Sequence, residues 1–110
     1  MEITHSPIPG GVVLHLAGRL DQVSAPVLEP QVMAALPENG VLVLDLAKLR
    51  YCSSAGLRVL LVAVKQAAAK RARFGLAAVQ PAVAEMLEST GVDKVVPSFP
   101  SAAQAAAALG

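Results

Sequence analysis

The sequence predicts an α/β fold, in which about four to five strands form a small mixed sheet with a mainly parallel core and about four helices pack against it. Strand-like and helix-like stretches alternate along the chain, which is typical of such sheets. Gly40–Leu46 (GVLVLDL) is a continuous apolar run of strand length, as expected for a strand that is covered on both faces. A length of 110 residues suits one hydrophobic core, so residues 1–110 are expected to form a single domain.

Two strand-like stretches precede the first helix. Val12–Gly18 (VVLHLAG) alternates between inward and outward candidates after a turn at Pro9, Gly10 and Gly11. The short stretch Glu2–His5 (EITH) is the candidate for the other arm of a hairpin. An antiparallel pair is therefore expected at the N-terminus.

The first helix is expected to begin after Ser24, because serine is a preferred capping residue and Pro26 suits a first turn. It should end near Leu36, which Pro37 follows. Pro30 lies inside this helix and is expected to bend it or to delay its start.

The second helix is predicted from Ser54 to about Arg71. Val59 and Val62 lie outside its main apolar face, and two interpretations of them stay open: they belong to the core, or they form part of an exposed docking surface. The residues with the spacing of one buried helical face are Leu57, Leu60, Leu61, Val64 and Ala68.

The C-terminal part of the chain continues the alternation. Arg73–Val79 is a weaker strand pattern, and Pro81–Ser89 is a short helix that Gly91 should end. Lys94–Phe99 is a short edge-strand candidate, and Ser101–Leu109 is an alanine-rich last helix.

Composition excludes several classes of partner. Nine Lys and Arg against eight Asp and Glu give a net charge of +1, too small for binding to a phosphate backbone, and only three residues are aromatic, so no nucleic acid is expected. No stretch reaches the roughly 18 to 20 apolar residues of a membrane span, and the N-terminus has no secretory signal. Cys52 is the only cysteine and is expected to be buried. We expect a cytoplasmic protein without membrane insertion.

The connection from the Gly40–Leu46 strand to the second helix is the best candidate for a functional site. Sites in parallel α/β sheets collect where strand ends lead into helix N-termini. Asp45 near the strand end and Ser54 at the helix start are therefore expected on the same rim. By itself, Ser54 suits an ordinary N-cap.

Enzyme and metal chemistry find little support in the sequence. His5 and His15 have no neighbouring ligand set, so no metal is expected. The stretch CSSAG lacks the first glycine of G-x-S-x-G, and no histidine follows Ser54 as that hydrolase order requires. The phosphate-loop pattern is absent. We expect no catalytic residues and no cofactor.

Two segments carry a family resemblance. Asp45–Leu61 (DLAKLRYCSSAGLRVLL) resembles the signature segment of STAS domains, the anti-sigma factor antagonist family. Gly18–Asp21 (GRLD), followed by the helix start at Ser24, is similar to the family's second segment. The order of strands and helices also agrees, so the resemblance covers nearly the whole chain and implies a STAS-like fold.

The resemblance implies partner switching. A serine kinase that also acts as an anti-sigma factor would bind the unmodified chain and phosphorylate it on Ser54, and a serine phosphatase would reverse the modification. Many members carry Asp at the position of Ser53. Ser53 is therefore either a helix-entry residue or a phosphate acceptor that competes with Ser54. The alternative function is an accessory subunit of a lipid-transport ATPase or a regulator of a secretion system. A weak homodimer is left open.

The expected docking surface surrounds Ser54. Asp21 has two open interpretations, a turn residue or a partner contact. A second interpretation of Asp45 is that it simply caps or orients the loop that follows it. The residues expected to bind the partner are Asp21, Ser53, Ser54, Ala55, Gly56, Arg58, Val59 and Val62.

Overall fold

The computed structural model describes residues 1–110 and confirms the predicted α/β fold. Its five strands lie in the order β1-β2-β3-β4-β5, with β1 antiparallel to β2 and every other pair parallel. The elements are β1 (Glu2–Ile8), β2 (Gly11–Leu20), α1 (Ala25–Ala35), β3 (Val41–Cys52), α2 (Ser54–Lys70), β4 (Arg73–Ala77), α3 (Pro81–Thr90), a 3₁₀ turn (Val92–Lys94), β5 (Ser98–Phe99) and α4 (Ala102–Leu109).

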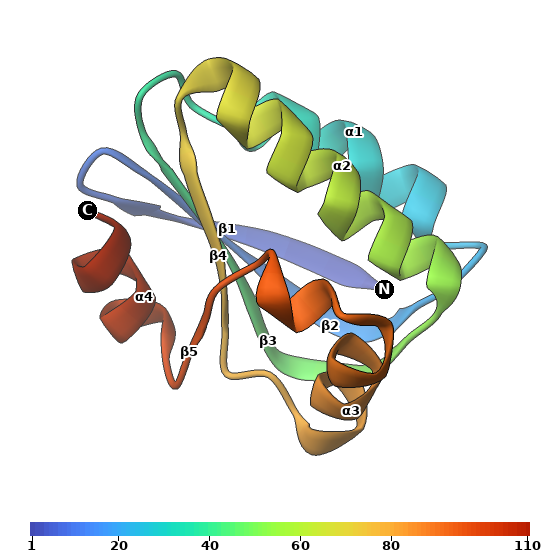
Figure 1. The fold of residues 1–110 in the computed structure, drawn as a ribbon. Coiled ribbons are helices and arrows are strands. Elements are labelled where there is room, and N and C mark those ends of the chain that lie inside the picture. Colours follow the sequence, from blue (N-terminus) through green and yellow to red (C-terminus); the bar gives the residue numbers. More distant parts are fainter.

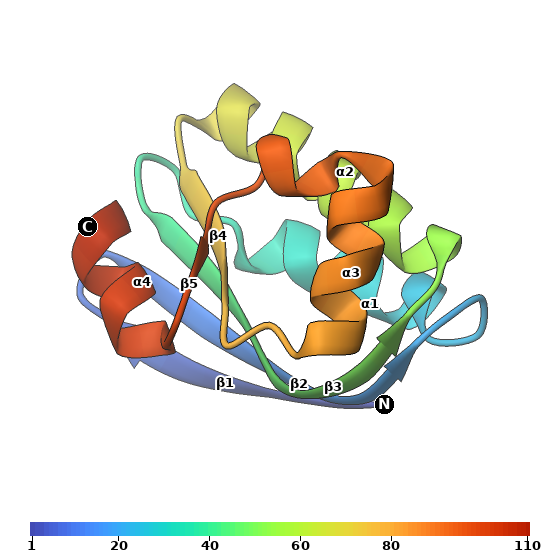
Figure 2. The same cartoon turned by 60° about the horizontal axis from the view of Figure 1, so that its bottom comes forward.

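The helices cover the two faces of the sheet unequally (Figures 1 and 2). Helices α1, α2 and α3 bury one face in the larger hydrophobic core, which takes Leu14 and Leu16 from β2. Val13, which precedes Leu14, points to the other face, where it joins a small cluster with Ala105 of α4. Because α4 is short, it covers only part of that second face. None of the helices combines the length and the apolar character that a membrane span requires.

Strand β3 is longer than the sequence predicted. It continues past Leu46 to Cys52 because β2 runs beside it to its end, where Leu20 pairs with Cys52. Leu49 and Cys52 are buried on this extension. The segment predicted as a loop is therefore strand, and the site-bearing connection shrinks to a single residue, Ser53, before α2.

Helix α2 buries a different set of residues from the predicted one. Leu57 and Leu60 are buried as expected, but Leu61 is 43% exposed, Ala68 is also exposed and Val64 is only half-buried. Val59 is buried, so its core interpretation is confirmed and its assignment to a docking surface is wrong. The reason is that α2 packs against α1 as well as against the sheet, which buries residues on two adjacent sides of the helix. The residues it buries are Gly56, Leu57, Val59, Leu60, Ala63 and Ala67.

Three predictions about the boundaries of helices and strands have different outcomes. Helix α3 ends as expected at Gly91, whose φ of 79° is in the left-handed region. Pro30 lies inside α1 without delaying its start, because the helix begins at Ala25. The predicted Lys94–Phe99 strand is reduced to the two residues of β5, since a 3₁₀ turn occupies its beginning.

Candidate functional site

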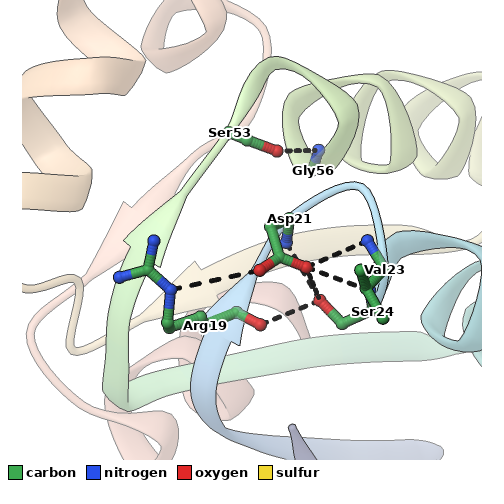
Figure 3. A network of polar contacts seen from close by, with 6 residues as sticks. All are labelled: Arg19, Asp21, Val23, Ser24, Ser53 and Gly56. Atoms are coloured by element: carbon green, nitrogen blue, oxygen red, sulfur yellow. Dashed lines mark hydrogen bonds and ion pairs between the residues drawn. The ribbon is translucent and has the colours of Figure 1, made fainter.

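The N-terminus of α2 and the loop that follows β2 form one surface (Figure 3). The backbone N–H of Ser53 donates to the carbonyl of Leu20 at 2.9 Å, which ties the start of α2 to the end of β2. The loop Asp21–Ser24 then leads from Leu20 into α1. Residues from both predicted family segments therefore lie side by side.

Ser53, rather than Ser54, caps α2. Ser53 has extended backbone geometry, and its hydroxyl accepts the N–H of Gly56 at 3.4 Å. Ser54 is the first residue of the helix, and it is exposed. The interpretation of Ser54 as the N-cap is thus wrong, whereas Ser53 is the helix-entry residue.

Gly56 brings the first turn of α2 close to the sheet. A Cβ at this position would lie 2.6 Å from Leu20 Cγ and 2.8 Å from Cys52 Sγ, so a side chain does not fit. Gly56 is buried and cannot itself belong to an exposed docking surface, which corrects that expectation. Burial raises the pKa of the Cys52 thiol to about 11, so this cysteine is an unreactive core residue, as predicted.

Asp21 organises the loop between β2 and α1. Its Oδ1 accepts the N–H groups of Val23 at 3.0 Å and Ser24 at 3.1 Å. The Ser24 N–H, which has the larger effect, and the Val23 N–H hold the pKa of Asp21 below its usual range. Ser24 does not cap α1 with its side chain; its hydroxyl donates to the carbonyl of Arg19 at 2.8 Å. The turn interpretation of Asp21 is confirmed.

Arg19 connects this loop to β3. Its guanidinium lies 4.2 Å from the ring centroid of Tyr51, the residue that pairs with it across β2 and β3. Its Nε lies 4.0 Å from Asp21 Oδ2. The Arg19 guanidinium, the Tyr51 ring and the Asp21 carboxylate thus lie beside the start of α2. The sequence did not predict this arrangement, because Tyr51 is far from the other two residues along the chain.

A groove of about 380 Å³ runs between α1 and α2, and Ala55, the residue after Ser54, is one of its lining residues. Arg58 Nη1 lies 3.9 Å from Glu29 Oε1 across it, and the Arg58 side chain is 76% exposed, so this ion pair contributes little to stability. Ala55 and Pro26 line opposite walls, and Val59 lines the interior. Arg58 is therefore exposed, as predicted, and Ala55 is half-buried beside Ser54.

Exposed apolar side chains also lie near the start of α1. Val23 is 83% exposed and Val27 is 58% exposed. The prediction missed both, although an apolar residue in a polar turn, as Val23 is, was a usable signal. Val62, which the sequence placed on the docking surface, is only half-buried.

Asp45 lies far from Ser54, contrary to the prediction. Asp45 pairs with Ala77 at the end of β4, but β3 continues to Cys52. At about 3.3 Å per residue, that extension separates Asp45 from the start of α2 by roughly 20 Å. The Asp45 side chain accepts the N–H of Ala47 at 3.0 Å and contacts His15 instead.

Comparisons with known proteins agree with this architecture. Residues 8–97 match the family model described as "Mlab, STAS domain". BtrV of Bordetella bronchiseptica, named as an anti-sigma factor antagonist, is 36% identical over 111 residues, which cover 99% of this chain and 95% of BtrV.

Two solved structures are also similar. The crystal structure of an anti-sigma factor antagonist from Mycobacterium paratuberculosis has a TM-score of 0.87 and 28% identity, covering 98% of this chain and 92% of that one. The phosphorylated form of the Bacillus cell fate determinant SpoIIAA has a TM-score of 0.68 and 16% identity, covering 90% of this chain and 92% of that one.

Proposed function

The chain belongs to the STAS domain family of anti-sigma factor antagonists, and we propose that it works as a switch controlled by phosphorylation of Ser54. In this proposal the unmodified chain binds a serine kinase that is also an anti-sigma factor. Phosphorylation on Ser54 releases the kinase, and a serine phosphatase restores the binding form. The exposed position of Ser54 at the start of α2 carries the proposal.

The surroundings of the two serines favour Ser54 over Ser53 as the acceptor. The Ser53 hydroxyl is half-buried and holds the Gly56 N–H, so transfer of phosphate to it would disturb the cap. The Ser54 side chain is exposed and has no hydrogen bond within the chain that it must give up. A kinase can therefore reach Ser54 without unfolding the first turn.

A phosphate on Ser54 would be tolerated by the fold. It adds about −1.5 to −2 charges, and the N-terminus of a helix favours negative charge because its first N–H groups lack partners within the helix. Arg58, four residues later on α2, is exposed and only loosely held by Glu29. One helical turn separates positions i and i+4, so Arg58 can pair with the phosphate. The modification thus changes the surface rather than the fold.

The neighbouring surface suits a partner that discriminates between the two forms. Exposed apolar side chains at Val23 and Val27 combine with the exposed Arg58, as an apolar centre with a polar rim does in many interfaces. A partner fitted to the neutral hydroxyl of Ser54 would have to desolvate a dianion after modification. Such a penalty is on the order of several kcal/mol, enough to release the partner.

Ser53 stands where the resemblance expects Asp in many members. Serine and aspartate are both effective N-caps, so the substitution keeps the cap of α2 while removing a negative charge next to Ser54. We infer that the cognate kinase recognises a less acidic surface than the kinases of Asp-bearing relatives.

The test uses the purified chain with its cognate serine kinase, ATP and Mg²⁺. Tryptic peptides are then analysed by mass spectrometry, and the product is treated with the cognate phosphatase. We expect one phosphate, on Ser54, that the phosphatase removes. A chain that binds the kinase but is never phosphorylated would overturn the switch while leaving family membership intact.

A further inference from the structure

Three side chains from three strands form a hydrogen-bonded chain on the second face of the sheet. Ser6 Oγ lies 2.8 Å from His15 Nε2, and His15 Nδ1 lies 2.7 Å from Asp45 Oδ2. Ser6 belongs to β1, His15 to β2 and Asp45 to β3, and His15 and Asp45 are directly paired in the parallel register. The sheet therefore brings together a serine, a histidine and an aspartate that lie far apart in the sequence.

The two contacts of the imidazole fix the direction of the hydrogen bonds. An ionised carboxylate only accepts, so Nδ1 carries the proton that it donates to Asp45. In the neutral ring, Nε2 then has only its lone pair, and the Ser6 hydroxyl must donate to it. This is the arrangement in which a histidine removes the proton of a serine nucleophile and a buried or half-buried aspartate holds the correct tautomer.

The His15 and Asp45 side chains of this hydrogen-bonded group lie beside an open cavity. His15 and Asp45 line a cavity of about 330 Å³ together with Thr4 and Lys48. The side chain of His15 is 35% exposed and that of Asp45 is 20% exposed, so both are accessible from this side. Helix α4 packs through Ala105 onto Val13, on the neighbouring part of the same face, and none of its residues lines the cavity.

We propose that Ser6 is a reactive nucleophile that His15 activates as a general base and Asp45 orients, with small carboxylic esters as its substrates. Ser6 Oγ forms a bond to the carbonyl carbon, and the bond from that carbon to the ester oxygen breaks. The Ser6 proton passes to His15 Nε2 and then to the leaving alkoxide, which departs as an alcohol. Water later attacks the acyl group, releases the carboxylic acid and restores the hydroxyl. Ser54 takes no part in this chemistry.

An alkyl fluorophosphonate tests the nucleophile directly. Attack by Ser6 forms the Oγ–P bond, breaks the P–F bond and releases fluoride, with the serine proton taken up by His15. Peptide mapping by mass spectrometry then compares the labelling rate of Ser6 with that of the other serines of the same chain. We expect Ser6 to be the dominant site, and we expect p-nitrophenyl acetate to acetylate the same residue.

Two substitutions test the roles of the partners. His15→Gln removes the base, and Asp45→Asn offers the ring an amide that favours the wrong tautomer, so each should slow Ser6 labelling by about tenfold or more. His5→Gln is the matched control, because His5 is exposed and precedes Ser6 on β1 and therefore points to the other face of the sheet. It should label at the wild-type rate, as should Ser89→Ala on α3.

Circular dichroism confirms that each variant is folded before its rate is compared. The proposal is overturned if wild-type Ser6 reacts no faster than the other serines, or if folded His15→Gln and Asp45→Asn label at the wild-type rate. The wild-type comparison needs no variant, so it decides the matter even if His15→Gln fails to fold.

Discussion

The hydroxyl of Ser53 accepts the N–H of Gly56 at 3.4 Å, and this contact makes Ser53 the cap of α2 and leaves Ser54 exposed. Ser53 therefore stabilises the helix, and the adjacent Ser54 is the residue that the proposed switch modifies. Ser53→Ala should cost about 0.5–2 kcal/mol of unfolding free energy, because it removes a helix cap. Ser54→Ala should leave the free energy of unfolding nearly unchanged, since alanine has a high helix propensity. Urea denaturation of both variants measures the difference, and the opposite ranking would show that Ser54 is the cap.

Gly56→Ala should destabilise the protein, although glycine to alanine usually stabilises a helix by about 1 kcal/mol. The added Cβ would meet Leu20 and Cys52 at 2.6 and 2.8 Å, which forces α2 away from the ends of β2 and β3. We expect a loss of about 1–3 kcal/mol, typical of overpacking. Thermal unfolding checks the sign, and a gain in melting temperature would contradict the close approach described for this turn.

Leu60 and Leu61 are adjacent on α2 but differ in burial. Leu60 is 1% exposed, so Leu60→Ala should cost about 2–5 kcal/mol through lost contacts and a residual cavity. Leu61 is 43% exposed, and Leu61→Ala serves as the matched control with an expected loss below about 1 kcal/mol. Equal losses in urea denaturation would mean that the register of α2 is different.

The stability of the loop after β2 should depend on pH through Asp21. Its backbone partners lower the folded-state pKa, so its ionised form stabilises the fold fully above the unfolded pKa of about 3.9. That contribution is lost as the pH falls through the lowered folded value. Asp21→Asn cannot ionise, so its deficit in unfolding free energy relative to wild type should shrink as the pH falls below about 4. A deficit that grows on acidification would contradict the role given to this carboxylate.

Much of the fold was predictable because the signals are local. The proline and glycine turns, the apolar run at Gly40–Leu46 and the glycine at position 91 mark boundaries that depend on few neighbours. The length of β3 was not predictable in the same way. Lys48 and Arg50 look like loop residues, and they are strand only because β2 offers a partner as far as Leu20.

The start of α2 was predicted correctly, but several details around it were wrong. The segment CSSAG pointed to the start of α2, yet a one-residue shift separates the cap from the exposed hydroxyl, and periodicity alone does not resolve it. The interpretation of Val59 stayed open between core and docking surface because the sequence does not show that α1 packs against that side of α2. The contact of His15 with Asp45 and Ser6 depends on strand register, which no local pattern encodes.

The proposed switch requires that negative charge at Ser54 controls the binding of the partner. The most direct measurement is a titration of the cognate kinase with wild type, Ser54→Ala and Ser54→Asp, with Ser53→Ala as the control for the cap. Ser54→Ala should bind like unmodified wild type. Ser54→Asp should remain folded but bind about tenfold more weakly or worse, a difference of about 1.4 kcal/mol. Equal affinity of the Ala and Asp variants, or phosphate found only on Ser53 after kinase treatment, would contradict the assignment of Ser54 as the switch.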